Sequence, residues 1–353
     1  MRLDAFTERV MRKNKSNQSR LPLTISAQYG LVDQITFFNK VVASTDLSNY
    51  YLLKKGEFAY NKSYSSDYPW GAIKRLDNYD QGALSSLYIC FAPQDNVVSD
   101  FILQYFESPK WHKGISEIAV EGARNHGLLN VAVQDFFHTY HYVPKDKKEQ
   151  IKISKLLMLL DERIATQSKI IDKLQSLIKG IGKQLFMDNQ NWRTVKIGEL
   201  LRIGNGKDYK HLSIGKIPVY GTGGQMLLVN DYLYDGESVC IGRKGTIDTP
   251  MFLKGKFWTV DTLFYTYDFK DVLPKFCYYL FLQINWKLYN EGTGVPSLSK
   301  STIENIKVKI PSLEQQHKIC SILDCYEHKT NNEEQILELY HSEKQYLLRQ
   351  MFI

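Results

Sequence analysis

The feature of this sequence that most restricts its fold is a pattern that occurs twice. Residues 183–187 read KQLFM and residues 349–353 read RQMFI, so each pentapeptide has a basic residue, Gln, an apolar residue, Phe and a second apolar residue. A repeat that keeps its spacing over a long stretch predicts two equivalent structural elements. Upstream residues that match at the same constant spacing are Ile153 with Ile319, Leu156 with Ile322, Leu157 with Leu323, Ile171 with Leu337, and Ile181 with Leu347.

The match continues further towards the N-terminus, but its spacing changes slowly. Glu121-Gly122 corresponds to Glu291-Gly292. Loop insertions would produce such drift in a globular unit, whereas the rigid spacing downstream suits a helix of fixed length. We therefore infer a duplicated chain, which its length of 353 residues allows. Its segments are two globular units, 1–145 and 191–310, and two helices, 146–190 and 311–353.

Each helical segment carries a row of residues, here called its seam, at alternating steps of three and four. This is the heptad pattern of a coiled coil, and in the first segment Gln167 alone interrupts it. The first seam consists of Leu157, Leu160, Ile164, Ile171, Leu174, Ile178, Ile181 and Leu185. The second seam has a more polar middle and consists of Leu323, Tyr326, Thr330, Glu333, Leu337, Tyr340, Lys344, Leu347 and Met351.

Two arrangements of these helices fit the pattern. Each helix could pack on its own globular unit, as most amphipathic helices do. The sustained heptads, and the opposite net charges of the basic segment 146–190 and the acidic segment 311–353, favour an antiparallel coiled coil instead. Pairing about a local dyad would also bring the polar interruptions Gln167 and Glu333 close together.

The two globular units have the pattern of mixed folds. Runs typical of strands, such as residues 85–91 and 261–267, alternate with helix-like runs, such as residues 100–108 and 274–286. The predicted fold class is α+β. Two duplicated globular domains are separated by two long helices, which form an antiparallel coiled coil with pseudo-twofold symmetry.

Composition excludes several classes of protein. The five cysteines are odd in number and include no C-x-x-C pair, which argues against a disulfide framework or a zinc site and for a reducing, cytoplasmic compartment. The N-terminus lacks the apolar run of a signal peptide, and no stretch approaches the roughly 20 apolar residues of a membrane span. The net charge of +7, with both globular units basic, suits a polyanionic partner such as nucleic acid.

Catalytic motifs are absent from the sequence. It has no glycine fingerprint for a cofactor and no N-P-P-Y loop of a methyltransferase. His138 and His141 are three residues apart, but their aromatic neighbours and the lack of a third ligand nearby favour a structural role. We expect no catalytic residue, no metal site and no cofactor in this chain.

Three glycine-rich loops of the second globular unit, residues 203–210, 217–225 and 240–247, are candidates for binding. They lack the spacing of phosphate-cradling motifs. They combine backbone N–H groups with cations, which suits contacts to a DNA backbone, although they could also be plain solvated loops. The candidate DNA-contacting residues here are Lys207, Tyr209, Lys210, Tyr220, Thr222, Arg243, Lys244 and Thr246.

The first globular unit offers a parallel set of loops at residues 26–30, 59–65 and 121–127. Arg, Lys, Asn and Gln are the side chains able to form bidentate contacts with guanine or adenine edges. The candidate DNA-contacting residues here are Gln28, Tyr29, Asn61, Lys62, Tyr64, Arg124, Asn125 and His126.

Over essentially its whole length the chain resembles a specificity subunit of a type I restriction-modification enzyme. The stretches that carry the resemblance include GKDYK…IPVYGTGG (206–224), IGRKGTI (241–247) with FWTVDTLF (257–264), and the two helix beginnings KEQIKISKLLMLLDERI and PSLEQQHKICSILDCYE. TISAQYG (24–30) and VEGARNHGLLN (120–130) resemble the first recognition domain of some members.

The resemblance implies a function and a set of partners. Each target-recognition domain would read one half of a bipartite target in double-stranded DNA, and the helices would set the unread spacer. The helices would also dock two modification (methyltransferase) subunits, which work with restriction (endonuclease and translocase) subunits. S-adenosylmethionine, ATP and Mg would be bound by those partners, and this chain would be a non-catalytic subunit. Many members have a longer segment before the first recognition domain, whereas this sequence enters that domain almost at once.

Two other functions fit the pattern less well. The chain could be a coiled-coil scaffold whose globular heads bind proteins only, or a DNA enzyme without a recognisable motif. A steep salt dependence of duplex binding would distinguish a DNA reader from a protein scaffold, because neutralised phosphates release counterions.

Overall fold

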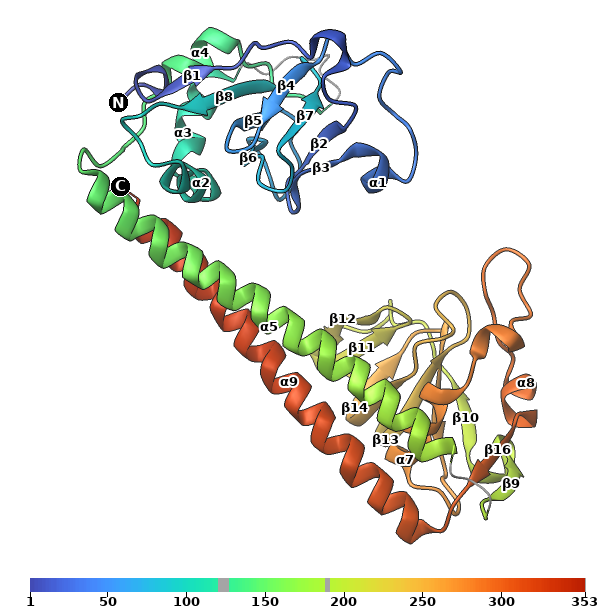
Figure 1. Cartoon of the computed structure of the whole chain (residues 1–353). Helices are drawn as coiled ribbons and strands as arrows, with labels where there is room; N and C mark the ends of the chain where they lie inside the picture. The colour runs from blue at the N-terminus through green and yellow to red at the C-terminus, as the bar shows by residue number, and fades with distance from the viewer. Residues whose placement is uncertain (120–126, 188–190, 353) are drawn as a thin grey trace. The chain divides into compact units, whose positions relative to one another are not determined.

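The structure, a computed structural model, describes residues 1–119, 127–187 and 191–352, and the chain divides into two compact units. Unit 1 consists of Met1–Ser168 and Ile336–Ile353, and unit 2 consists of Lys169–Gln335. Each unit therefore combines one globular segment with part of each long helix. The predicted mixture of helices and sheets is confirmed (Figure 1).

Among its described residues, unit 1 contains two four-stranded sheets. The first has the order β1-β8-β5-β6 and is antiparallel throughout. Its strands are β1 (Thr7–Arg9), β8 (Ile89–Pro93), β5 (Phe58–Asn61) and β6 (Ala72–Arg75). The second has the order β3-β2-β7-β4, with β2 and β7 parallel. Its strands are β3 (Gly30–Asp33), β2 (Pro22–Ser26), β7 (Gln81–Leu84) and β4 (Tyr51–Lys54).

Short helices surround these sheets, and aromatic rings fill the core between them. Phe58 of β5 stacks on Phe91 of β8, with ring centroids 5.4 Å apart, and Tyr60 stacks on Phe136 at 5.0 Å. The helices are α1 (Gln34–Phe38), α2 (Ser99–Glu107), α3 (His112–Ile118) and α4 (Val133–His138), with the 3-10 turns η1 (Leu3–Ala5), η2 (Lys15–Asn17) and η3 (Pro109–Trp111).

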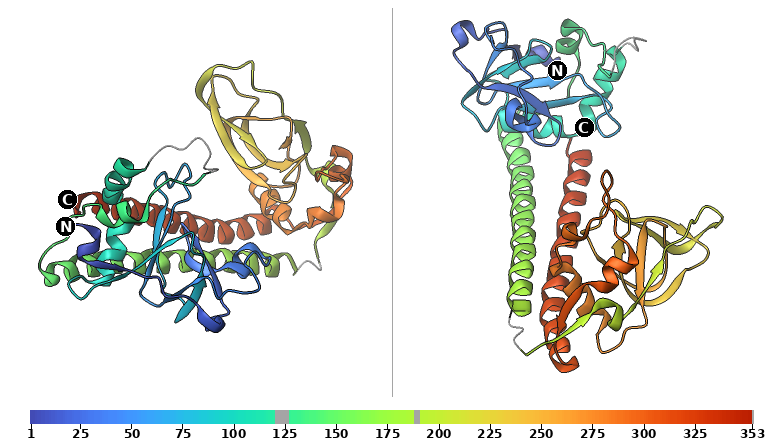
Figure 2. Two further views of the ribbon diagram at one scale, coloured as in Figure 1. Left: turned by 90° about the horizontal axis from the view of Figure 1, so that it is seen from above. Right: turned by 90° about the vertical axis from the view of Figure 1, so that its right-hand side faces the viewer.

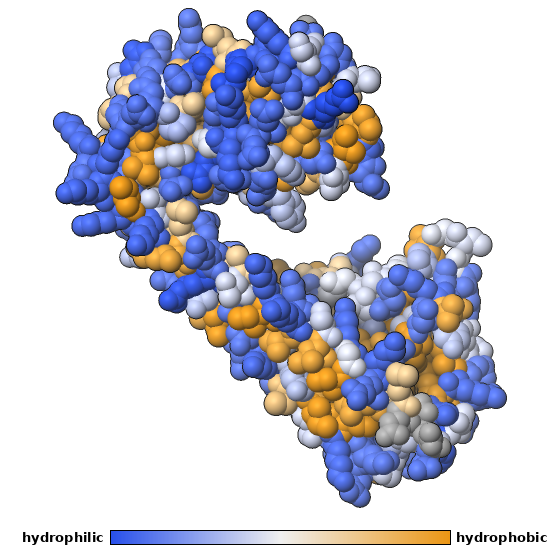
Figure 3. Space-filling model, viewed as in Figure 1, coloured by the Kyte–Doolittle hydropathy of each residue, from blue (hydrophilic) through white to orange (hydrophobic). Residues whose placement is uncertain are grey.

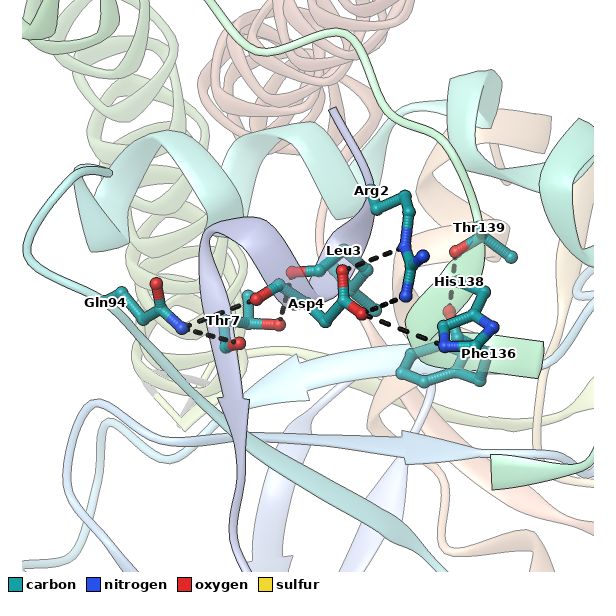
Figure 4. Close-up of polar contacts among 8 residues, drawn as sticks. All are labelled: Arg2, Leu3, Asp4, Thr7, Gln94, Phe136, His138 and Thr139. Atoms are coloured by element: carbon teal, nitrogen blue, oxygen red, sulfur yellow. Dashed lines mark hydrogen bonds and ion pairs between the residues drawn. The ribbon is translucent and has the colours of Figure 1, made fainter. Parts of the chain in front are cut away.

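Polar contacts fix the N-terminal residues to the rest of unit 1 (Figure 4). Thr7 Oγ1 donates a hydrogen bond to Leu3 O (2.8 Å), and Gln94 Nε2 donates one to Thr7 O (3.1 Å). Asp4 forms an ion pair with Arg2 and lies 3.9 Å from His138 Nε2. The chain therefore enters the first sheet in a defined position.

Unit 2 has one six-stranded sheet and one two-stranded sheet. The larger sheet has the order β10-β15-β13-β14-β11-β12, and its β11–β14 pair is parallel. Its strands are β10 (Arg202–Asn205), β15 (Leu263–Tyr267), β13 (Tyr234–Gly242), β14 (Met251–Thr259), β11 (Ile214–Gly221) and β12 (Gly224–Val229). The other elements are β9 (Arg193–Lys196), β16 (Lys307–Ile310), α6 (Ile197–Leu200), α7 (Pro274–Gln283), α8 (Lys300–Asn305) and the 3-10 turn η4 (Trp286–Tyr289).

The two long helices are α5 (Lys147–Met187) and α9 (Leu313–Gln350). Each begins after a capping residue, because Asp146 Oδ1 accepts from the Lys148 N–H (2.8 Å) and Ser312 Oγ accepts from the Gln315 N–H (3.4 Å). No residue of either predicted seam is exposed, and Gln167 itself is only 7% exposed. Among the described residues, no helix is long and apolar enough to cross a membrane.

Within each unit the two long helices run antiparallel. In unit 1, Leu157 of α5 shares a core with Leu348 and Phe352, and Asp161 pairs with Lys344 one turn earlier on α9. In unit 2, Gln175 Nε2 donates to Glu334 (3.4 Å), and the next turns of α5 share a core with the first turns of α9. The alternative in which each helix packs only on its own globular segment is therefore wrong.

The same side chains join the helices to the sheets in both units. The buried Gln150 of α5 accepts from the Val98 N–H (2.7 Å) and donates to Pro144 O (2.7 Å). The buried Gln316 of α9 accepts from the Leu273 N–H (2.9 Å) and donates to Pro311 O (3.1 Å). Val98 and Leu273 are the N-cap residues of α2 and α7, so each glutamine closes the start of the helix that packs beside it.

Candidate nucleic-acid interface

In unit 2, loops from separate parts of the chain meet at the turn between β14 and β15, residues 260–262. The Lys207 N–H donates to Thr259 O (2.8 Å), and the Trp258 indole N–H donates to Lys207 O (2.9 Å). The Arg243 N–H donates to Thr262 O (2.8 Å). The turn therefore holds the loop after β10 beside the loop after β13.

The hairpin between β11 and β12 joins the same cluster. Tyr220 O accepts from the Val260 N–H (3.0 Å), and Thr222 Oγ1 lies 3.5 Å from the position that a Cβ on Gly245 would take. The structure thus brings five of the sequence-predicted residues of unit 2 to one edge of the sheet. They are Lys207, Tyr220, Thr222, Arg243 and Lys244.

Glycines in these loops allow close approach of the backbone. A Cβ on Gly206 would lie 1.9 Å from Val260 O, and a Cβ on Gly242 would lie 2.0 Å from Thr246 O.

The prediction of three separate glycine-rich loops was wrong in extent, because most of residues 214–229 form the hairpin β11–β12 and only residues 222 and 223 turn between the strands. Apolar and polar side chains alternate too weakly along residues 214–229 for the sequence to predict these two strands.

The surface of this cluster is cationic. Lys207, Lys210, Arg243 and Lys244 are exposed. The ion pairs that unit 2 forms among its described residues use other cations. The charges of Lys207, Lys210, Arg243 and Lys244 are therefore available to a polyanion. Basic side chains and backbone N–H groups are the usual partners of a polyanion.

Two tyrosines stand beside these cations, partly buried. Tyr209 packs against the apolar cluster around Trp258, and Tyr220 packs against the one around Phe257. Burial raises the pKa of Tyr220, so its hydroxyl stays neutral and can donate a hydrogen bond. Thr246, the last predicted residue of this unit, is exposed on the same loop as Arg243.

In unit 1, the residues after β5 pair with a loop from much later in the chain. The Leu129 N–H donates to Lys62 O (2.9 Å) and the Tyr64 N–H donates to Gly127 O (3.1 Å). In unit 2 the Leu298 N–H donates to Arg243 O (2.9 Å) and the Gly245 N–H to Pro296 O (2.8 Å). The isolated bridges Ser63 with Leu128 and Lys244 with Ser297 complete the same pattern.

The predicted residues of unit 1 are less concentrated than those of unit 2. Asn61 Oδ1 accepts from the Ser63 N–H (3.0 Å), so this side chain stabilises its own turn. Gln28 and Tyr29 lie at the turn between β2 and β3 in the other sheet, where the Tyr29 ring is 68% exposed and contacts Phe37. The predicted residues Arg124, Asn125 and His126 lie outside the described residues.

Sequence reasoning missed the two segments that organise these loops in unit 2. The turn 260–262 and the loop 296–298 hold the cations in place through backbone atoms alone. No side-chain pattern marks such a role, although the turn is part of the stretch FWTVDTLF. The exposed apolar residues Phe37, Phe38 and Val41 of unit 1 were also not singled out.

The two histidines considered as metal ligands have different surroundings. His138 lies 3.9 Å from Asp4, whereas His141 is buried among other side chains. His141 is 2% exposed and lies between Tyr105 OH (3.1 Å from Nδ1) and Thr139 Oγ1 (2.7 Å from Nε2). Because the Thr139 hydroxyl donates to Phe136 O, it accepts from Nε2, which leaves Nδ1 to accept from Tyr105. Burial, and then the Met1 ammonium, lower the pKa of His141 to about 4. The described residues contain no group of three or more His, Cys, Asp or Glu that could hold a metal.

Comparison with known proteins finds one matching family and several similar sequences. The family described as type I restriction modification DNA specificity domain matches residues 189–339. The chain is 24% identical over 147 residues to the EcoprrI specificity subunit of Escherichia coli, which covers 38% of this chain and 36% of that protein. It is 24% identical over 189 residues to the MjaVIII specificity subunit of Methanocaldococcus jannaschii, which covers 46% of this chain and 42% of that protein. The matches thus span less than half the length of these relatives.

Solved structures share the fold over the whole chain. The S subunit of a type I restriction-modification system from M. genitalium has a TM-score of 0.62 at 17% identity and covers 100% of this chain and 95% of its own. A chain from a study of complex assembly and conformational transition of the type I R-M system has a TM-score of 0.61 at 13% identity, with 99% and 96% covered. The resemblance drawn from the sequence motifs is confirmed by the family match and by the similarity to the two specificity subunits, and these structures share the fold.

Proposed function

We propose that this chain, whose residues 189–339 match the type I DNA specificity domain, reads a bipartite DNA sequence for a restriction-modification system, one half-site per unit. One observation carries the proposal: the matched segment contains the whole cationic cluster around the turn 260–262 of unit 2. Lys207, Arg243 and Lys244 are held there by backbone bonds, exposed and outside the ion pairs of the unit. Such a preorganised cationic edge suits a duplex.

Unit 1 would read the other half-site, since we propose that the two units are copies of one ancestral domain. Three correspondences support this. The sheet orders β1-β8-β5-β6 and β10-β15-β13-β14 have the same antiparallel neighbours. The indole N–H of Trp111 donates to Phe106 O (3.0 Å) as that of Trp286 donates to Phe281 O (2.9 Å). The capping glutamines Gln150 and Gln316 are the third.

The long helices would form one antiparallel coiled coil with pseudo-twofold symmetry, set the spacer between half-sites and dock two modification subunits. Apolar side chains exposed on α5, such as Leu159, Ile170 and Leu177, support docking, because a partner could cover them. Apolar surface is visible along the long helices in Figure 3. Methyl transfer and cleavage, with S-adenosylmethionine, ATP and Mg, would belong to partner modification and restriction subunits in the cytoplasm. The chain itself would be non-catalytic.

The decisive experiment exchanges one recognition unit. Residues 1–145 are replaced by the equivalent segment of a relative with a known target, and methylated adenines in the host genome are sequenced. We expect one half-site to change and the other to stay. A motif that changes in both halves, or in neither, would exclude the assignment of one half-site to each unit.

The role of the helices as a ruler is tested separately. Inserting one heptad into both α5 and α9 adds roughly 10 Å at 1.5 Å per residue, or about three base pairs. The spacer of the methylated motif should lengthen accordingly. An unchanged spacer in a fully active complex would show that the helices do not set it.

A further inference from the structure

Unit 1 exposes two adjacent phenylalanine rings on the helix α1. Of the phenylalanines that the structure describes, only Phe37 and Phe38 are exposed, each to 44%. Their ring centroids are 5.0 Å apart, and the Phe37 ring lies 6.4 Å from the exposed ring of Tyr29. These three rings are here called the aromatic patch. Exposed apolar groups that cluster in this way usually mark a binding surface.

Hydrogen bonds hold the aromatic patch in place. Asp33 caps α1, because its carboxylate accepts from the Ile35 N–H (3.0 Å) and from the Thr36 hydroxyl (2.6 Å). The Tyr29 N–H donates to Ser26 Oγ (3.1 Å), which fixes the turn between β2 and β3. The three rings are therefore presented in one arrangement.

The turn that carries Tyr29 has a counterpart in unit 2. The hairpin β2–β3 lies beside β7 with β2 and β7 parallel, as the hairpin β11–β12 lies beside β14 with β11 and β14 parallel. The turn 27–29 thus corresponds to the turn 222–223, and Thr222 belongs to the cationic cluster of unit 2. Tyr29 therefore lies at the edge of unit 1 that contacts DNA in the proposed function.

The two phenylalanines lie in a segment that is longer in unit 1 than in unit 2. Residues 34–50 connect β3 to β4, whereas residues 230–233 connect β12 to β13. These connections are equivalent, because β4 pairs with β7 as β13 pairs with β14. The aromatic patch is thus an addition to unit 1, and a role specific to one half-site suits it.

The aromatic patch lies away from the long helices, where we propose docking of modification subunits. The apolar core beneath the hairpin β2–β3 includes Leu23, Ile25 and Leu31, and contains no described residue of α5 or α9. Those helices join the other core of unit 1, with Phe101 and Phe136. In Figure 1 and in the left view of Figure 2, α1 lies at the end of unit 1 away from both chain termini. Position therefore favours DNA over a modification subunit as the partner of the patch.

The chemistry of this segment suits the interior of a duplex with a phosphate beside it. Residues 34–39 carry no charge. Lys40 follows them, is exposed, and takes no part in the ion pairs among the described residues of unit 1. Uncharged aromatic rings can enter between base pairs, and a cation next to them can contact the backbone.

We propose that Phe37 and Phe38 form a wedge that enters one base step of the half-site read by unit 1. Apolar side chains that insert between base pairs unstack them and kink the duplex. TA and CA/TG steps unstack most readily, so the wedge selects such a step without a hydrogen bond to its bases. The inference rests on the proposed function, since it requires that unit 1 contacts the duplex.

The test uses the complex of this chain with its modification subunits, bound to a duplex that carries the methylated motif found by sequencing. Permanganate oxidises unstacked thymines, and TA and CA/TG steps each contain a thymine. We expect one thymine in the half-site of unit 1 to react several-fold faster in the complex than in free DNA. The double variant Phe37→Ala/Phe38→Ala should abolish this enhancement.

A second measurement addresses selection of the step. Replacing the step by the stiffer AA step should weaken binding of the original complex by about tenfold. The double variant should bind both duplexes equally, while its preferences at the other positions of the motif remain. A discrimination that persists in the double variant would overturn the role of the wedge in reading.

Three controls accompany these measurements. Leu282→Ala removes an apolar side chain of matched exposure (43%) in unit 2 and should change neither result. Phe38→Leu keeps an apolar side chain at the tip and should retain part of the permanganate enhancement. The thymine opposite the methylated adenine in the half-site of unit 2 should react equally in all complexes, and thermal unfolding checks that each variant folds.

The outcomes separate the wedge from the proposed function. A motif that does not follow unit 1 in the exchange experiment would refute the proposed function, and the wedge with it. If the motif follows unit 1 but no thymine of its half-site becomes reactive, the wedge alone is overturned. Loss of modification subunits from the double variant in gel filtration, with permanganate reactivity unchanged, would also overturn the wedge and assign the patch to a protein contact.

Discussion

In both units a buried glutamine of a long helix bonds to the N-cap residue of the helix beside it, but the side chains around this connection differ. His141 of unit 1, held by Tyr105 and Thr139, stands in the ladder position that Val308 occupies in unit 2. The difference shows that the connection between the globular segment and the long helices accommodates side chains of different polarity in the two units. Both units keep the capping glutamine.

A second difference lies at the helix surface. In unit 1, Asp161 of α5 accepts from Gln104 (2.8 Å) and pairs with Lys344 of α9 (2.5 Å). In unit 2, Glu327 of α9 accepts from Tyr279 (3.1 Å) and pairs with Lys275, which comes from α7 and not from the other long helix. The cation thus joins the two long helices in unit 1, and joins α7 of the globular segment to α9 in unit 2.

The largest expected effect comes from removing the glutamine that caps α2 or α7. Gln150→Leu leaves the Val98 N–H and the Pro144 carbonyl without this partner, and Gln316→Leu leaves the Leu273 N–H and the carbonyls of Asp271 and Pro311 without theirs. Each loss should cost roughly 2–6 kcal/mol in the free energy of unfolding. Hydrogen exchange should accelerate in α2 for the first variant and in α7 for the second. The exposed neighbour Gln315→Leu is the control and should change little. An unchanged free energy of unfolding in either variant would contradict the capping role of that glutamine.

The next effect should distinguish the units by pH. Because the folded pKa of His141 is lowered to about 4 from an unfolded value near 6.5, the neutral ring stabilises unit 1 above pH 6.5. That stability is lost as the pH falls, by roughly 2 kcal/mol between pH 6.5 and 5. Urea unfolding followed by a probe in each unit should show the slope in unit 1 alone. His141→Val, which copies unit 2, should remove the slope; a slope that persists would mean that another group titrates.

Arg243→Ala tests whether the cluster of unit 2 reads bases. If Arg243 contacts a base edge, preference should relax at one position of one half-site, at a cost of about 1–3 kcal/mol. Binding to a panel of single-base variants of the target measures this. A uniform loss over the whole panel would assign Arg243 to the phosphates instead.

The smallest effect is expected for Lys207→Ala. We expect Lys207 to contact a phosphate, so its loss should weaken binding to all sequences and flatten the salt dependence of binding by about one. Lys254→Ala is the control, because Lys254 is paired with Glu237 (3.1 Å) away from the cluster. A change of preference at one base with an unchanged salt slope would rule out the phosphate role.

Much of this architecture could be predicted from the sequence, and the limits have physical reasons. Positions of the long helices followed from the seams, because a helix repeats its burial locally. The runs 100–108 and 274–286 were recognised as helices, and α2 and α7 lie there with small shifts in their ends.

Long-range pairing could not be read from the sequence. The bonds of Arg243 and Lys62 to loops far along the chain depend on backbone atoms, which leave no residue pattern.

The division of unit 1 between the two ends of the chain sets an order for folding during synthesis. Unit 2 is continuous, Lys169–Gln335, so its core can close once this stretch has left the ribosome. The core of unit 1 includes Leu348 and Phe352 beside Leu157, so the part synthesised first must wait for the last turns of α9. A nascent chain therefore cannot present a finished first unit before the second exists.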